Sequence, residues 1–181
     1  MTVRIALFRG INVGGRNRLP MKELKSIFEC AGCSDVKSYI QSGNIVFTRA
    51  GTDDGALSRT LCAAIEAQFG FSPTVLLLPA TALQAALAAN PFPGAESKPQ
   101  SLHLWFMEDL PADADCDRML ALKTANEAFA LRGRVLYLHA PDGVGRSKLA
   151  QRIEHLLGVP ATARNWRTAT RILALADIGP P

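Results

Sequence analysis

Short apolar runs alternate with amphipathic stretches along the first 79 residues, and their order predicts a β-α-β-β-α-β half. Residues 3–8 form an apolar run that stops at Gly10, which is typical of a buried strand. Pro20 then begins a stretch with apolar residues at helical spacing, and Gly32 is placed to end that helix. The same reasoning predicts strands over 36–40, 45–48 and 73–78, and a helix with Leu57, Leu61, Ile65 and Phe69 on one face.

The second half of the chain predicts a similar series. The elements are a strand over 102–107, a helix over 113–124, hairpin strands over 128–131 and 135–139, a helix over 147–157 and a last helix near 168–176. We therefore predict an α+β protein with two ferredoxin-like halves, and favour a duplication. We place an N-terminal ferredoxin-like subdomain at 1–79, a helix and linker at 80–100, and a C-terminal α+β subdomain at 101–181.

Composition limits the class of protein. The chain has 181 residues, of which 48% are hydrophobic and 20% charged, and no apolar run reaches the ~20 residues of a membrane helix. The N-terminus enters an apolar strand directly, without the pattern of a secretory leader. Four cysteines are too few for a disulfide scaffold. We expect a cytoplasmic protein with reduced thiols and no membrane partner.

The net charge of +4 is distributed unevenly along the chain. Residues 1–28 carry six Lys or Arg side chains against Glu23 alone, and residues 143–181 carry six against Glu154 and Asp177. Most of the acidic residues lie between these segments. Two readings stay open: the two ends meet in one basic face, or the charges are ordinary solvated surface.

A glycine-rich loop between the first strand and the first helix is the strongest candidate site. Arg9, Asn12, Gly14, Gly15, Arg16 and Asn17 lie in it, followed by Arg18. Glycines and donors at a helix N-terminus are suited to an anion. The loop is a near miss to a nucleotide-binding P-loop, because Arg16 and Asn17 stand where Lys and a hydroxyl residue are needed. The alternative is that the glycines only permit a tight turn.

Three further segments join the candidate site. Ser42 and Asn44 lie in a turn between two strands, which a hairpin alone explains. A second glycine-containing loop precedes Arg146, Ser147 and Lys148. Arg164, Asn165 and Trp166 precede the last helix, where Asn165 suits the cap and Trp166 suits either packing or stacking on a base.

Four segments occur together in one order: 9–15 (RGINVGG), 38–47 (SYIQSGNIVF), 145–149 (GRSKL) and 162–166 (TARNW). This set resembles the bacterial domain-of-unknown-function 1697 family (DUF1697). The resemblance covers nearly the whole chain. It implies a compact α+β protein built from two related halves, and it implies no activity, substrate or cofactor.

These observations favour a binding module for a phosphate-bearing ligand, either a nucleotide or a nucleic acid. We expect Arg9–Arg18, Ser42–Asn44 and Arg164–Trp166 to converge into one basic cleft, with Lys148 and Arg146 as further cations. Two alternatives stay open: an enzyme acting on a small phosphorylated substrate, and a non-catalytic interaction protein. The sequence identifies no catalytic residue, metal ligand set or cofactor, and leaves the oligomeric state open.

Overall fold

The chain forms two compact units, each with its own sheet and core. The structure, a computed structural model, describes residues 1–51 and 53–178. Unit 1 comprises residues up to Ala85 together with the segment from Arg171 onward, and unit 2 comprises Ala86–Thr170. The elements are β1 (Thr2–Arg9), α1 (Met21–Cys30), β2 (Ser34–Tyr39), β3 (Asn44–Arg49), α2 (Asp54–Phe69), β4 (Thr74–Pro79), α3 (Ala80–Ala88), β5 (Leu102–Met107), α4 (Cys116–Leu122), β6 (Ala128–Arg132), β7 (Val135–His139), α5 (Ile153–Leu157), β8 (Ala161–Asn165) and α6 (Trp166–Ala176), with short 3-10 helices at Pro93–Ser97 and Val144–Arg146.

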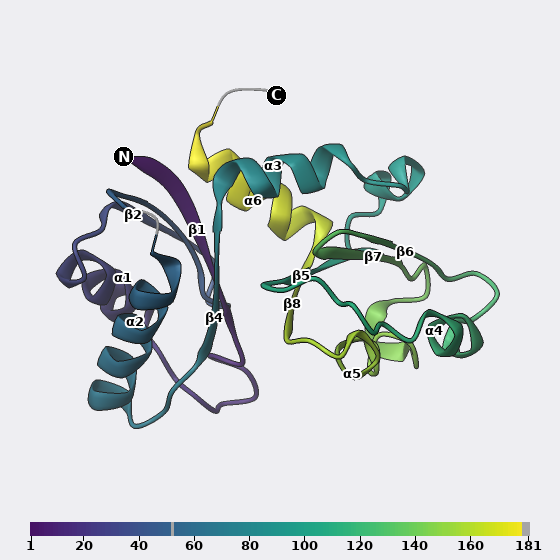
Figure 1. Cartoon of the computed structure of the whole chain (residues 1–181), viewed down its shortest axis with the longest axis horizontal. Coiled ribbons are helices and arrows are strands. Elements are labelled where there is room, and N and C mark those ends of the chain that lie inside the picture. The colour runs from purple at the N-terminus through teal and green to yellow at the C-terminus, as the bar shows by residue number, and fades with distance from the viewer. Residues whose placement is uncertain (52, 179–181) are drawn as a thin grey trace. The chain divides into compact units, whose positions relative to one another are not determined.

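Unit 1 contains a four-stranded antiparallel sheet in the order β2-β3-β1-β4. The central strand β1 pairs with β3 from Thr2 opposite Arg49 to Leu7 opposite Asn44, and with β4 along its other edge. This order, with helices after the first and third strands, is the ferredoxin-like arrangement that the sequence predicts. Figure 1 shows α1 and α2 side by side on one face of the sheet.

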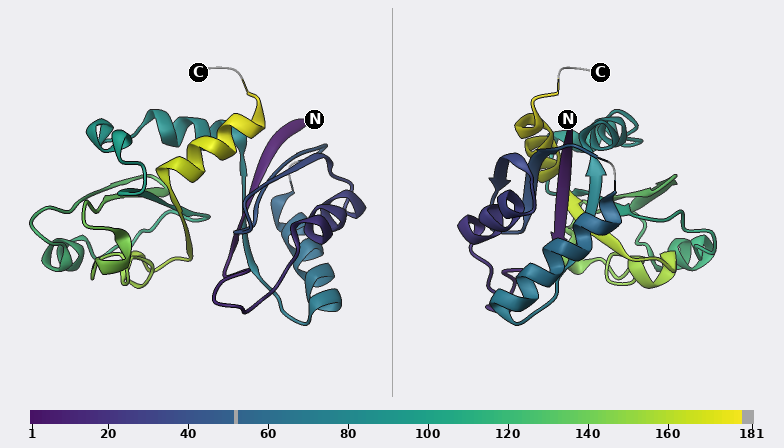
Figure 2. Two further views of the ribbon diagram at one scale, coloured as in Figure 1. Left: turned by 180° about the vertical axis from the view of Figure 1, so that it is seen from behind. Right: turned by 60° about the vertical axis from the view of Figure 1, so that its left-hand side comes forward.

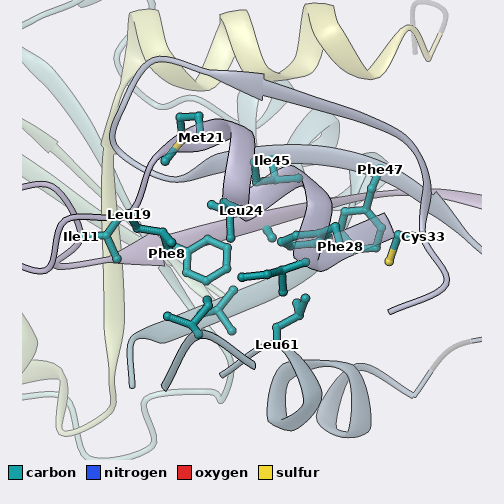
Figure 3. Close-up of a cluster of buried hydrophobic side chains, with 14 of the residues drawn as sticks. Phe8, Ile11, Leu19, Met21, Leu24, Phe28, Cys33, Ile45, Phe47 and Leu61 are labelled. Carbon is teal, nitrogen blue, oxygen red and sulfur yellow. The ribbon is translucent and has the colours of Figure 1, made fainter. Parts of the chain in front are cut away.

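The core of unit 1 lies between that sheet face and the two helices. Alternate residues of β1 and β3 point into it, because side chains alternate between the faces of a strand. Phe28 of α1 packs between Phe8 and Phe47 (Figure 3), and its ring centroid lies 6.1 Å from that of Phe8 and 5.0 Å from that of Phe47. Leu61 of α2 closes the other side. Burying each such side chain contributes about 1.5–3 kcal/mol, so this cluster fixes the frame from which the loops project.

Unit 2 repeats the topology. Its antiparallel sheet has the order β6-β7-β5-β8, which corresponds element by element to the order of unit 1. Figure 2 shows this sheet and the elements around it from two further directions. Trp105 and Met107 of β5 and Leu136 of β7 meet Met119 of α4 and Ile153 of α5 in the core. The two halves predicted from the hydrophobic pattern are therefore present as two similar α+β units.

The structure corrects three elements in the second half. The sequence analysis missed β8, which is formed by the segment Ala161–Asn165 pairing with β5. The helix predicted over 147–157 is helical only from Ile153, because separate turns occupy 148–152. The helix predicted over 113–124 begins at Cys116, where the Asp115 carboxylate accepts a hydrogen bond of 2.9 Å from the Arg118 N–H and caps the first turn.

Candidate anion-binding site

The glycine loop of unit 1 folds as a small hairpin of its own. Gly14 and Gly15 form its two-residue turn with φ values of +58° and +76°, and the Arg16 N–H donates to Val13 O at 3.0 Å. Positive φ at both positions is the geometry of a type I′ turn, which glycine adopts without strain. Both glycines are exposed, and a side chain at either would meet nothing within 4 Å. The hairpin therefore presents bare backbone at its tip.

Two asparagines hold this hairpin from within. The Asn12 amide donates to Leu19 O and to Gln41 O, and its Oδ1 accepts from the Leu19 N–H, all at 2.8 Å. The Asn17 amide donates to Gly10 O at 2.9 Å. These side-chain amides supply hydrogen-bond partners for backbone groups of the loop. Asn12 and Asn17, both predicted as ligand donors, thus act in the structure to shape the loop.

The loop also contacts the β2–β3 turn. The Phe8 N–H donates to Gly43 O at 2.8 Å, and a Cβ at Gly43 would lie 2.5 Å from the Phe8 Cβ. Asn44, at the start of β3, is buried and its amide donates to Tyr39 O at 3.1 Å and to Ser42 Oγ at 2.9 Å. Unit 1 thus brings the Arg9–Arg18 and Ser42–Asn44 segments together, with Asn44 bracing the turn from inside.

Cationic side chains cover the outside of the loop. Arg9, Arg16 and Arg18 are all exposed, and the segment 1–22 contains no Asp or Glu. Within residues 1–51 and 53–178, neither Arg16 nor Arg18 pairs with a carboxylate. In Figure 1 the loop is the purple segment at the end of β1 farthest from the N label. The local charge is therefore positive with no internal neutralising partner at Arg16 and Arg18.

An open hollow of about 460 Å³ adjoins this surface. Its lining is Asn12, Gly15, Arg18, Leu19, Pro20 and Gln41. No histidine, cysteine or carboxylate is among these residues, so the hollow offers no group for acid–base or nucleophilic catalysis. The sequence analysis did not single out Gln41, although its place between the two segments, in the same turn as Ser42, was a usable signal.

The remaining predicted site residues belong to unit 2. Ser147 is buried, and its hydroxyl accepts a hydrogen bond of 3.0 Å from the Ala150 N–H. Arg146 and Lys148 beside it are exposed. Ser147 therefore shapes its turn, and the two basic side chains project to solvent. Whether this segment holds an anion stays a prediction.

The segment before α6 is more deeply placed than a binding loop. Asn165 Oδ1 accepts from the Thr168 N–H at 2.8 Å, which makes Asn165 the helix cap that the sequence predicts. Trp166 is only 8% exposed and so offers no open stacking face. Arg164 donates to Ala163 O at 2.8 Å, and burial lowers its pKa to about 10, which leaves it charged at neutral pH. The convergence of this segment with the glycine loop stays a prediction.

Residues 1–51 and 53–178 hold no group of three or more His, Cys, Asp or Glu side chains arranged to bind a metal ion. No helix in the same part of the chain has the length and apolar character needed to span a membrane.

Fold and loop together define a class of α+β protein with two ferredoxin-like units and a basic glycine hairpin on the first. The family described as "Protein of unknown function (DUF1697)" matches residues 1–137, and the chain belongs to that family. Among solved structures, a conserved bacterial protein, SP0830, from Streptococcus pneumoniae is similar over 97% of this chain and 99% of its own, with 26% identity and a TM-score of 0.70. No curated protein matches the chain.

Proposed function

We propose that this protein binds the phosphate backbone of a nucleic acid through the glycine hairpin of unit 1. The observation that carries the proposal is the pair Arg16 and Arg18, exposed on a hydrogen-bonded loop in a segment without any carboxylate. Guanidinium groups bind phosphate oxygens through two parallel hydrogen bonds. The exposed backbone of Gly14 and Gly15 adds donors at the tip of the same loop.

The internal hydrogen bonds of the loop favour binding over a purely structural role for its arginines. Asn12 and Asn17 hold the loop through hydrogen bonds to Leu19 and Gly10, and none of these bonds uses the side chain of Arg16 or Arg18. A loop held in one shape also loses little conformational entropy when a ligand arrives. The arginines are therefore displayed on a surface that is prepared before binding.

The openness of the surface favours a polyanion over a small phosphorylated molecule. Small-ligand sites are concave and enclose most of the ligand. The hairpin tip instead projects into solvent, and the hollow beside it is open and mostly apolar. A nucleic acid can place successive phosphates along such a surface without being enclosed. This geometry also gives little support to the alternative of an enzyme acting on a small substrate at this loop.

Fluorescence anisotropy with a short labelled single-stranded DNA tests the proposal. We expect binding at about 50 mM salt that weakens steeply towards about 200 mM, because phosphate contacts release counterions. The double variant Arg16→Gln, Arg18→Gln should lower the slope of log K against log salt by about 1.4, since each phosphate contact contributes about 0.7.

The matched control is Arg59→Gln, Arg171→Gln, which removes the same charge from two exposed positions on the helices of unit 1. Its affinity should stay within about twofold of the natural chain if the hairpin is the contact surface, since distant charges are largely screened. Absence of binding at low salt would refute the proposal. An equal loss in both double variants would assign the effect to net charge alone.

A further inference from the structure

Unit 2 contains a polar hollow that is separate from the glycine hairpin. It has a volume of about 310 Å³ and lies between α4 and α5, which contact one another beneath the sheet of unit 2 (Figure 1). Its lining is Asp115, Arg118, Leu122, Arg152, His155 and Leu156. Arg118 and Leu122 are one helical turn apart, as are Arg152 and His155, so each pair shares a face of its segment.

Backbone hydrogen bonds fix the walls of this hollow. The Asp115 N–H donates to Leu156 O at 2.8 Å and so ties the start of α4 to α5. The Leu156 N–H donates to Arg152 O at 2.9 Å, which holds Arg152 at the start of α5. Because Leu156 takes part in both bonds, the two segments that carry the arginines are held at one spacing.

The charged groups of the hollow are mainly cationic. Arg118 and Arg152 contribute two guanidinium groups, and His155 contributes an imidazole. Across residues 1–51 and 53–178, none of these three side chains has an ion-pair or hydrogen-bond partner. The single carboxylate, Asp115, uses Oδ1 to cap α4 through the Arg118 N–H. Two fixed positive charges therefore face one hollow against one negative charge.

We propose that this hollow binds the phosphate group of a small organic phosphate monoester. Two guanidinium groups and an imidazole supply the donors that phosphate oxygens accept, and the guanidinium fork matches their geometry. Leu122 and Leu156 supply an apolar wall for the organic part of the ester. The volume stands near the lower end of the range for ligand pockets, which excludes a bulky ligand. The site is independent of the nucleic-acid surface proposed for unit 1.

Isothermal titration of the full chain with phenyl phosphate, inorganic phosphate and phenol tests this site. We expect phenyl phosphate to bind more tightly than inorganic phosphate, and phenol not to bind, because the site needs both the anion and the apolar part. Arg118→Gln and Arg152→Gln should each weaken phenyl phosphate binding by about tenfold or more, which is the ordinary effect of losing a charge-assisted hydrogen bond.

Three further variants distinguish phosphate binding in this hollow from an effect of positive charge elsewhere on the protein. Asp115→Asn keeps a capping side chain and removes the opposing charge, so it should strengthen phenyl phosphate binding by about threefold. Arg167→Gln removes an exposed arginine elsewhere in unit 2 and should leave the affinity within about twofold. Arg16→Gln, Arg18→Gln in unit 1 should also leave it unchanged.

Circular dichroism checks folding, and we expect the Arg118→Gln and Arg152→Gln variants to fold because both arginines are exposed. Four results would overturn the proposal: no heat of binding with phenyl phosphate, equal affinity for phenyl phosphate and inorganic phosphate, equal losses in Arg167→Gln and Arg118→Gln, or weaker binding in Asp115→Asn. The first and third remove the site altogether. Equal affinity for phenyl phosphate and inorganic phosphate would show that the organic part of the ester is not recognised. Weaker binding in Asp115→Asn would show that the Asp115 carboxylate contacts the ligand.

Discussion

Asn12 and Leu19 are joined by two hydrogen bonds that run in opposite directions. The Asn12 amide nitrogen donates to Leu19 O, and the Leu19 N–H donates back to Asn12 Oδ1, each at 2.8 Å. The seven-residue step between them is the glycine hairpin, so one side chain closes the loop at its base. Leu19 is itself fully buried in the core of unit 1. The position of the exposed arginines is thus anchored to the hydrophobic core.

Replacing Asn12 by alanine is expected to lower the free energy of unfolding by about 3 kcal/mol or more. Three hydrogen bonds are lost, each with a net value near 1 kcal/mol, and alanine is also strained at the positive φ of this position. Urea unfolding measures the change. Gln41→Ala is the matched control, because the Asn12 amide bonds only to the backbone carbonyl of Gln41, and it should change stability by less than about 0.5 kcal/mol.

Gly43 is expected to be the least replaceable glycine of the β2–β3 turn and glycine hairpin. A Cβ there would lie 2.5 Å from the Phe8 Cβ and 2.6 Å from Ile11 Cδ1, at a φ of +72°. Gly43→Ala should therefore cost about 3 kcal/mol or more, from overpacking together with strain. Gly15→Ala has the strain but open space, so about 1 kcal/mol is expected. Thermal unfolding of the two variants should rank them in this order, and equal losses would contradict the packing argument.

Acid should destabilise unit 2 through His103. This imidazole is half-buried, its Nδ1 has no hydrogen-bond partner within the described residues, and burial lowers its pKa to about 4. In the unfolded chain the pKa of histidine is near 6.5, so between about pH 6.5 and pH 4 the unfolded state binds the extra proton. Stability should therefore fall as the pH falls through this window, by up to about 3 kcal/mol.

His103→Phe tests this assignment by removing the titrating group while keeping a ring of similar shape. The variant should lose most of the pH dependence between about pH 6.5 and pH 4 when unfolding is followed by urea titration. At pH 7 its stability should be close to that of the natural chain or above it, because an unpartnered buried nitrogen is removed. A pH profile identical to that of the natural chain would assign the acid sensitivity to other groups.

Removing one partner of the ion pair between Arg4 and Asp54 is expected to lower stability more than replacing both partners. Arg4 is buried at 6% exposure beneath the start of α2, where Asp54 is the first helical residue. Asp54→Ala should cost about 2 kcal/mol or more, since it leaves a buried guanidinium unpaired. Arg4→Met combined with Asp54→Ala should recover most of that loss. A double-mutant cycle in urea measures the coupling, and additive losses would show that the pair is not coupled.

The fold was predictable from the sequence where apolar residues dominate an element. Strands β5 and β7 are apolar runs, α1 and α2 carry apolar residues at helical spacing, and the structure places all four as predicted. Strand β8 is not predicted from the sequence, because its residues, ATARN, are small or polar and show little hydrophobic pattern. Its pairing with β5 makes it a strand. Leu149, Ile153 and Leu157 have helical spacing, yet α5 begins only at Ile153, because the backbone of 148–152 forms separate turns.

The candidate site was predictable only in part. The density of arginine and glycine marks the loop, and the sequence predicts that this loop and the β2–β3 turn lie together, as the Asn12–Gln41 hydrogen bond shows. The inward roles of Asn12, Asn17 and Asn44 were not predictable, because a sequence does not show which backbone groups a turn leaves without partners. The hollow between α4 and α5 was missed because its arginines come from segments far apart in the chain.

The repeated topology of the two units has a consequence for the loops that project from them. The Phe8 N–H donates to Gly43 O in unit 1, and at the matching place in unit 2 the Met107 N–H donates to Arg134 O at 3.0 Å. The connection from the end of β1 to α1 has eleven residues, and the connection from the end of β5 to α4 has eight. Because the scaffolds match and the connections differ, each unit can carry its own chemistry on its connecting loop without disturbing the other unit.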